Sequence, residues 1–284
     1  MHDPLIAGLT GTTIGILFKE AIRRSLISTR AKRQAFEVSE KPGYGSRMID
    51  VLTSADKEAQ RICVRLIYQC MPGVHICAEE EPLNDPVPAA TRTFVTLDPL
   101  DGTRAFIRRQ SHGIASMLSL THDETIVSAF VGDVNTHEIY GYRPGSAKVH
   151  RIPMHERGEE LVVEPTKLWD GFILLRQPLE KHSQSAQDVI RCFRGHEIEG
   201  GSIGTWMARL WKREVNAVMI PPGTDTPWDT NPIYGISKHL GFTFWKKTSV
   251  KDYNGMIWVE YDPPIVRTVT EREHEVLIKH PLDT

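Results

Sequence analysis

The sequence feature that most constrains the fold is an apolar run that ends in carboxylates. Phe94-Val-Thr-Leu97 continues directly into Asp98-Pro-Leu-Asp-Gly-Thr103, and a second run at residues 74–78 continues into Glu79-Glu80-Glu81. Both runs predict strands. Carboxylates that lie together repel one another and lose hydration on burial, so they need cations or solvent. Because Mg²⁺ and similar hard cations bind carboxylate and carbonyl oxygens, the pattern predicts a metal site at two strand ends.

The stretch from Asp98 to Thr103 has the local features of a site for metal and phosphate together. Pro99 has a fixed φ angle, so we expect a turn that points Asp98 and Asp101 into one space. Gly102 and Thr103 then offer backbone N–H groups where a helix can begin, which is a typical phosphate-binding arrangement. For either aspartate taken alone, a turn or a helix cap is the favoured interpretation. In a chain of this length, the five fixed letters of D-P-x-D-G-T occur together by chance only about once in ten thousand sequences.

The periodicity of apolar residues divides the chain into two halves. Residues 1–150 are predicted to be an α+β half that holds the metal site, with helices at 14–36 and 56–70 and a surface loop at 41–46 between them. Residues 151–284 are predicted to be an α/β half that completes the site, and the polar stretch at 143–160 favours a linker. The other predicted elements are strands at 74–78, 94–98, 114–120, 125–131, 138–142, 171–175, 216–220, 242–245 and 257–261, and helices at 185–193, 205–214, 232–239 and 271–280.

Composition excludes several classes of function. The 284 residues include 34 Lys and Arg against 36 Asp and Glu, and this balance argues against nucleic acid or an anionic membrane as the main partner. The four cysteines show no C-x-x-C spacing, which is typical of a protein in a reducing compartment. The apolar stretch at residues 5–18 lacks the basic start of a signal peptide and is too short to span a bilayer. We therefore expect a cytoplasmic protein.

Taken together, these motifs resemble those of the inositol monophosphatase superfamily, whose members are Mg²⁺-dependent, lithium-sensitive phosphatases. The main signature is similar to residues 97–106 and the second to residues 228–232. Residues 50–56 and 78–80 match two supporting elements, and all four follow the family's order. The resemblance implies a layered α-β-α-β-α sandwich of the inositol monophosphatase and fructose-1,6-bisphosphatase type. It also implies a homodimer that binds a small phosphorylated metabolite.

The resemblance implies roles for individual residues. Two or three Mg²⁺ ions per site would activate water for direct attack on the phosphorus of a small phosphate monoester. The implied metal ligands are Glu79, Asp98, the Leu100 carbonyl, Asp101 and Asp229, although Glu80 can take the place of Glu79 in the triple-glutamate run. The implied catalytic residues are Asp56, Thr103 and Glu80, and the implied substrate contacts are Gly102, Thr103, Gly204, Thr205 and Asp229.

The sequence leaves the substrate open. Pro222 stands where inositol-preferring members look to have a glutamate, which argues against inositol recognition. Arg104-Ala-Phe-Ile107 looks more like the branches that act on histidinol phosphate or on 3′(2′),5′-nucleoside bisphosphates. Arg104, Arg108 and Arg109 can bind a second anionic group, but a solvated basic helix face is the favoured interpretation.

Two other classes of function are weaker candidates. The G-x-S-x-G pattern of a serine hydrolase occurs around Ser202, and the later acidic and histidine residues keep the required order: Asp225 or Asp229, then His239, His274 or His280. The pattern arises easily in a chain with 21 glycines, and residues 196–199 before it make a poor buried parallel strand. A non-catalytic regulator on a phosphatase scaffold is disfavoured because every expected type of metal ligand is present.

Overall fold

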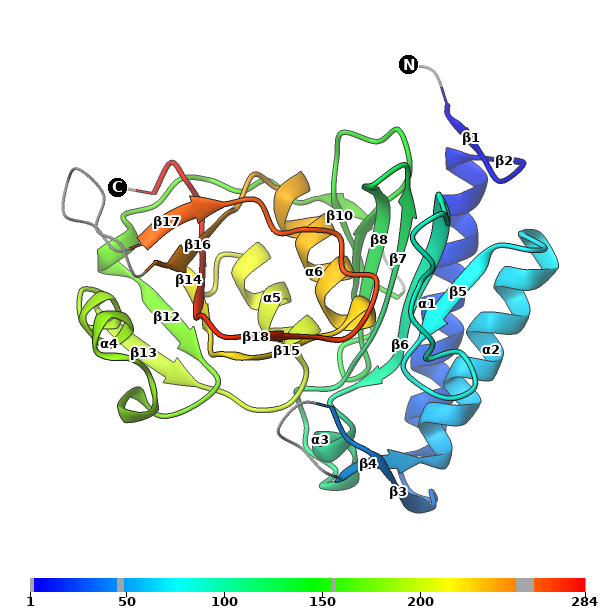
Figure 1. The fold of residues 1–284 in the computed structure, drawn as a ribbon, viewed down its shortest axis with the longest axis horizontal. Coiled ribbons are helices and arrows are strands. Elements are labelled where there is room, and N and C mark those ends of the chain that lie inside the picture. The colour runs from blue at the N-terminus through cyan, green and yellow to red at the C-terminus, as the bar shows by residue number, and fades with distance from the viewer. Residues whose placement is uncertain (1–2, 45–48, 155–156, 249–257, 284) are drawn as a thin grey trace.

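The structure, a computed structural model, describes residues 3–44, 49–154, 157–248 and 258–283. Helices alternate with the strands of two large sheets (Figure 1). The helices are α1 (Gly11–Lys32), α2 (Ser54–Cys70), α3 (Thr103–Ile107), α4 (Gln184–Ile190), α5 (Ile203–Trp211) and α6 (Pro227–His239), with 3₁₀ turns η1 (Leu168–Asp170) and η2 (Leu179–Lys181).

Within the described residues, the first sheet has seven strands in the order β11-β10-β9-β8-β7-β6-β5. They are β5 (His75–Ala78), β6 (Thr93–Asp101), β7 (Ala115–His122), β8 (Thr125–Asp133), β9 (Ile139–Tyr142), β10 (His150–Ile152) and β11 (Glu159–Glu160). The predicted strands of this half are confirmed to within a few residues. Among the described strands of this sheet, only the neighbours β5 and β6 run parallel, so their carboxyl ends lie at the same edge. The acidic residues that follow β5 therefore lie beside those at the end of β6.

The linker predicted at 143–160 is wrong in part, because it contains β10 and β11. His150 and Arg151 of β10 pair with Gly141 and Tyr140 of β9, so the first sheet continues to Glu160. An edge strand is held mainly by its backbone hydrogen bonds, so a polar stretch can form one without apolar side chains. The division of the chain near residue 150 stays a prediction.

In the part of the chain that the structure describes, the second sheet has six strands in the order β13-β12-β14-β19-β16-β17. They are β12 (Phe172–Leu175), β13 (Gly195–Ile198), β14 (Ala217–Ile220), β16 (Thr243–Lys247), β17 (Trp258–Tyr261) and β19 (Val276–Lys279). The helix predicted at 271–280 is wrong, since this segment holds β19 and part of β18 (Thr270–Arg272). β19 lies between β14 and β16 and is buried on both faces. A strand buried on both faces has a continuous apolar run, which periodicity alone does not separate from a buried helix.

Three two-stranded sheets complete the described structure. β1 (Leu5–Ile6) pairs with β2 (Leu9–Thr10), β3 (Val38–Pro42) with β4 (Ile49–Thr53), and β15 (Gly223–Asp225) with β18. The surface loop predicted at 41–46 is wrong at its start, because β3 continues through Pro42, and residues 45 and 46 lie outside the described residues. The first helix ends at Lys32, four residues before the predicted end.

The layers alternate between helix and sheet (Figure 1). Helices α1 and α2 cover one face of the first sheet, α5 and α6 fill the space between the sheets, and α4 covers the other face of the second sheet. Strand β12 shows this alternation: Leu174 packs in the core between the sheets, whereas Ile173 and Leu175 pack with α4. The predicted α-β-α-β-α sandwich is confirmed. Among the described residues, none of the helices is long and apolar enough to cross a membrane.

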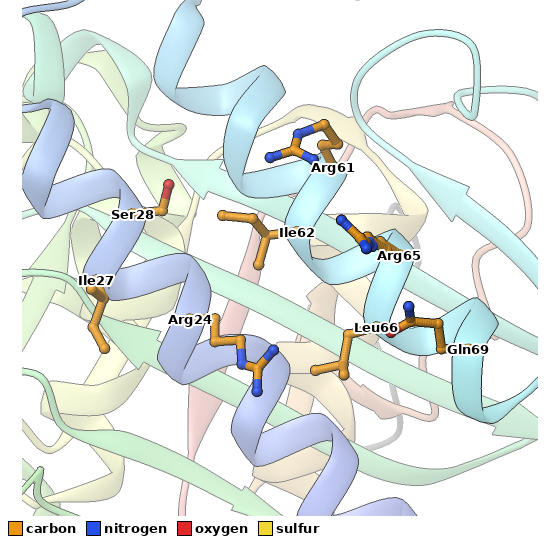
Figure 2. Close-up of a pocket in the computed structure, with 8 residues that line it drawn as sticks. All are labelled: Arg24, Ile27, Ser28, Arg61, Ile62, Arg65, Leu66 and Gln69. Atoms are coloured by element: carbon orange, nitrogen blue, oxygen red, sulfur yellow. The ribbon is translucent and has the colours of Figure 1, made fainter.

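An arginine-rich groove lies between α1 and α2 (Figure 2). Its volume is about 540 Å³, and it is lined by Arg24, Ile27, Ser28, Arg61, Ile62, Arg65, Leu66 and Gln69. Two of its arginines are paired along their own helices, with Arg24 Nε 2.8 Å from Glu20 and Arg61 Nη2 2.7 Å from Glu58. The predicted metal ligands do not line this groove, so it is separate from the candidate site.

Candidate active site

A bulge in β6 places Asp98 and Asp101 on the same side of the first sheet. Asp98 pairs with Met117 of β7 and Asp101 pairs with Ala115, so β6 has one residue more than β7 over this stretch. In a regular strand, the side chains of residues three apart point to opposite faces. The extra residue of the bulge brings the side chains of Asp98 and Asp101 to the same face. The turn predicted at Pro99 is therefore a bulge within one continuous strand, and both carboxylates still point into one space.

Three of the predicted metal ligands come together at this bulge. One carboxylate oxygen from each of Asp98, Asp101 and Asp229 lies within 4.8 Å of the other two. Burial raises the pKa of Asp98 well above its ordinary value, and the charges of Glu79, Asp229 and Asp101 raise it further. Burial also raises the pKa of Asp101 to about 7 and that of Glu79 to about 8. A bound cation would relieve this repulsion between carboxylates. We refer to Glu79, Asp98, Asp101 and Asp229 as the carboxylate cluster.

Asp229 joins the cluster from the first turn of α6. The Thr226 hydroxyl accepts a hydrogen bond from the Asp229 N–H at 3.3 Å and donates to Asp229 Oδ2 at 2.7 Å. The helix predicted at 232–239 begins five residues earlier, because Thr226 and Pro227 form a favourable N-terminus. Asp229 Oδ1 is buried and has no hydrogen-bond partner among the described residues. Such an oxygen is the donor that a hard cation requires, so the cluster fits Mg²⁺.

Thr103, at the start of α3, links the cluster to α2. Its hydroxyl donates to Asp56 Oδ1 at 3.0 Å and lies 3.2 Å from the Leu100 carbonyl oxygen. Asp56 also completes a capping box with Thr53 at the start of α2. Burial raises the pKa of Asp56, although the hydrogen bonds from Thr53 and Thr103 oppose that rise. The structure therefore brings together residues that belong to two separate motifs in the sequence.

Lys41 of β3 belongs to the site although the sequence did not indicate it. Its Nζ lies 2.8 Å from Glu79 Oε1 and 2.6 Å from Glu80 Oε1, and all three side chains are largely buried. Burial alone would lower the pKa of Lys41, but the two glutamates raise it well above its ordinary value. A single lysine 38 residues before Glu79 carries no sequence signal for this contact.

Lys41→Gln is expected to destabilise the metal-free protein by about 3 kcal/mol, because two buried glutamates lose their counter-charge. Added Mg²⁺ should recover part of this loss, since a cation at Glu79 restores the charge balance. Chemical denaturation with and without Mg²⁺ measures both effects. The control is Lys57→Gln at an exposed position of α2, which should change the free energy of unfolding by less than about 0.5 kcal/mol. Equal effects of the two substitutions would contradict this role for Lys41.

The G-x-S-x-G segment supports Asp101. It follows β13 and runs into the first turn of α5. β13 runs parallel to β12 at the edge of the sheet, where its polar side chains are partly exposed. Ser202 is buried and donates to Asp101 Oδ2 at 2.5 Å, and the Gly204 N–H donates to the same oxygen at 2.9 Å. A serine nucleophile needs an adjacent base that takes its proton during attack. This hydroxyl instead holds a carboxylate of the cluster, which argues against a serine hydrolase.

A cleft of about 570 Å³ opens beside the carboxylate cluster. The predicted site residues that line it are Glu79, Asp98, Leu100, Asp101, Gly102, Thr103 and Asp229. Glu80 does not line it, and its backbone instead bonds the side chain of Gln60. Gly204 and Thr205 do not line it either, and the Thr205 hydroxyl donates to the Ser202 carbonyl at 2.9 Å. The catalytic role of Glu80 and the substrate contacts of Gly204 and Thr205 stay predictions.

The five layers and the cleft define a layered α/β protein with an acidic site suited to hard cations. Residues 14–195, more than half of the chain, match the inositol monophosphatase family. The chain therefore belongs to the inositol monophosphatase family and has its phosphatase fold, as the resemblance predicted. No curated protein is similar enough in sequence to count as a match.

Solved structures show the same fold at low sequence identity. The Thermotoga maritima IMPase is 18% identical, with a TM-score of 0.68 over 93% of this chain and 91% of that chain. The extragenic suppressor protein suhB from Bartonella henselae is 16% identical, with a TM-score of 0.68 over 95% of both chains. An IMPase/NADP phosphatase in complex with NADP and Ca²⁺ is 17% identical, with a TM-score of 0.70 over 97% of this chain and 93% of that chain.

Proposed function

We propose that this protein is a Mg²⁺-dependent phosphatase that hydrolyses a small phosphate monoester. The observation that carries the proposal is the convergence of four carboxylates on one cleft, where a buried Asp229 oxygen has no hydrogen-bond partner in the described part of the chain. Family membership supports the same reaction class. The homodimer, the cytoplasmic location and the lithium sensitivity that the sequence suggested stay predictions.

The proposed Mg²⁺ ligands are the carboxylate cluster and the Leu100 carbonyl oxygen. When bound, Mg²⁺ lowers the pKa of water and offsets the charge of the phosphate. Glu79 rather than Glu80 takes the ligand position, because Glu79 lines the cleft and Glu80 does not. The proposed number of ions is two or three, as the resemblance implies.

The chain's own groups orient the water and the phosphate. The Thr103 hydroxyl donates its hydrogen bond to Asp56 Oδ1. The lone pairs of the hydroxyl oxygen can therefore accept a hydrogen bond from the attacking water. The proton of that water then passes through Thr103 to Asp56. Gly102 and Thr103 line the cleft, and their backbone N–H groups hold the phosphate. Phosphoryl transfer needs little more from the protein than this positioning and charge neutralisation.

A phosphate-release assay with and without Mg²⁺ tests the proposal. The substrates are inositol phosphates, histidinol phosphate, 3′-phosphoadenosine 5′-phosphate and fructose 1,6-bisphosphate. EDTA should abolish the release of phosphate, and excess Mg²⁺ should restore it. Release that survives complete chelation would contradict the dependence on Mg²⁺, and no release from the whole panel would contradict the phosphatase.

Ser202→Ala is expected to lower phosphatase turnover by no more than about tenfold, because it removes one of the hydrogen bonds that hold Asp101. It should also cost about 1 kcal/mol of stability, since Ser202 caps α5. Steady-state kinetics and thermal denaturation measure the two effects. A complete loss of activity, together with labelling of the wild-type protein by a fluorophosphonate, would favour the serine hydrolase instead.

A further inference from the structure

Three arginines share the cleft with the carboxylate cluster. Arg104 lies in α3 and Arg108 directly follows it, and residues four apart share one face of a helix. Arg176 directly follows β12 of the second sheet. All three are exposed and line the cleft. For Arg104 and Arg108, this place in the lining favours binding of an anion over the solvated helix face that the sequence suggested, whereas Arg109 does not line the cleft. We refer to Arg104, Arg108 and Arg176 as the basic wall.

The basic wall forms few ion pairs with the residues that the structure describes. Arg104 Nη2 lies 3.6 Å from Asp50 Oδ1, a distance typical of a weak surface pair. Among the described residues, Arg108 forms no ion pair. Arg176 Cζ lies 5.6 Å from the ring centroid of Trp206, and this stacking leaves the N–H edges of the guanidinium free to bind an anion. A fourth arginine of the cleft, Arg272, is instead buried and paired with an aspartate.

The cleft has both room and charge for more than one phosphate. Its volume of about 570 Å³ lies in the range of sites that hold whole metabolites. If divalent cations neutralise the carboxylate cluster, the other charged residues in the lining are four arginines and two aspartates, Asp50 and Asp225. The positive charges then outnumber the negative ones. A second anionic group on the substrate would balance this excess of positive charge.

We propose that Arg104, Arg108 and Arg176 bind a second phosphate group, so that the substrate is a small bisphosphate. This inference rests on the proposed phosphatase. Guanidinium groups bind phosphate oxygens through paired N–H donors. Three guanidinium groups complement the two negative charges of a phosphate better than the one charge of a carboxylate. The same positive charges disfavour a cationic leaving group such as histidinol. An uncharged polyol would form no ion pair with them.

Matched substrate pairs test the inference. The first pair is adenosine 3′,5′-bisphosphate and adenosine 3′-monophosphate, and the second is fructose 1,6-bisphosphate and fructose 1-phosphate. Within each pair the molecules differ only in the second phosphate, and the two pairs separate the effect of that phosphate from that of the base or sugar. We expect kcat/KM to be at least about tenfold higher for each bisphosphate, mainly through a lower KM. Histidinol phosphate should be the poorest substrate.

Arginine variants show which residues carry the preference. Arg108→Gln and Arg176→Gln should each reduce the ratio of kcat/KM between bisphosphate and monophosphate, and the double variant should bring it near one. Arg108→Lys should restore part of the ratio, because it keeps the charge but not the paired donors. The matched control is Arg65→Gln, an exposed arginine of the groove between α1 and α2, which should leave the ratio unchanged (Figure 2).

Calorimetric binding of the adenosine pair with Ca²⁺ in place of Mg²⁺ gives a readout that is independent of turnover. The tighter binding of the bisphosphate should disappear in the double variant. Equal kcat/KM within both pairs, or a preference that survives the double variant, would overturn the inference while leaving the phosphatase intact. No phosphate release from any of these substrates would instead contradict the phosphatase itself.

Discussion

Asp98→Asn is expected to lower kcat/KM for phosphate release by about a thousandfold or more, because it removes a ligand from the carboxylate cluster. Asp229→Asn should have a similar effect, since Asp229 Oδ1 is buried and no residue that the structure describes hydrogen-bonds to it. The fold should survive Asp98→Asn, because burial and neighbouring carboxylates already disfavour a charge at this position. The Tm of the metal-free variant should therefore equal or exceed that of the wild type. The rise in Tm on adding Mg²⁺ should shrink.

The matched control is Asp123→Asn. Asp123 is exposed in the turn between β7 and β8, and it pairs with Arg92 on the surface at 2.6 Å. This substitution should change neither the activity nor the response of the Tm to Mg²⁺. Circular dichroism separates a lost fold from a lost site. A folded Asp98→Asn variant with activity near that of the wild type would show that the proposed site is wrong.

Gly102→Ala is expected to cost about 3 kcal/mol of stability and to remove most of the phosphatase activity. Gly102 has a φ angle of 90°, a left-handed conformation that disfavours any side chain. An added Cβ would also lie 2.2 Å from the carbonyl oxygen of Gly113 and 3.0 Å from the backbone nitrogen of Ser202. Both neighbours belong to the backbone, so the chain itself has to move. That movement displaces Asp101 and Thr103, which flank Gly102, and small displacements of such groups slow a reaction strongly.

Gly73→Ala isolates the contribution of backbone strain. Gly73 has a φ angle of 81°, but an added Cβ there meets no atom within 4 Å among the described residues. This substitution should cost only about 1–2 kcal/mol and leave activity unchanged. Urea denaturation of both variants compares the two sites directly. Equal losses of stability would contradict the importance of the close backbone approach at Gly102.

Sequence predicted the parts of the fold that depend on neighbouring residues in the chain. The apolar runs before the acidic residues form β5 and β6, and α2 covers residues 54–70, close to the predicted 56–70. Alternation of side chains and helix caps act over a few residues, so one sequence is sufficient to predict them. The four motifs in their order were also sufficient to predict the family and its layered fold.

Predictions failed where partners distant in the chain decide the local structure. Residues 276–279 form a strand because β14 and β16 pair with both of its edges. The polar β10 and β11 form because the edge of the first sheet offers free backbone groups. Ser202 fits a hydrolase motif in the sequence, but its hydroxyl bonds Asp101, 101 residues earlier. Local patterns carry no information about such partners.

The sequence by itself determined which chemical groups the candidate site contains. The carboxylates follow apolar runs in the order of known motifs, and this pattern can be recognised from the sequence alone. Only the tertiary structure decided how these groups meet. The bulge in β6 turns two of the carboxylates to one side, β3 brings Lys41 against two glutamates, and the cleft places three arginines beside the cluster. The physical reason is that the chemical type of each side chain is given by the sequence at that position. The distances between side chains depend instead on how sheets and helices pack.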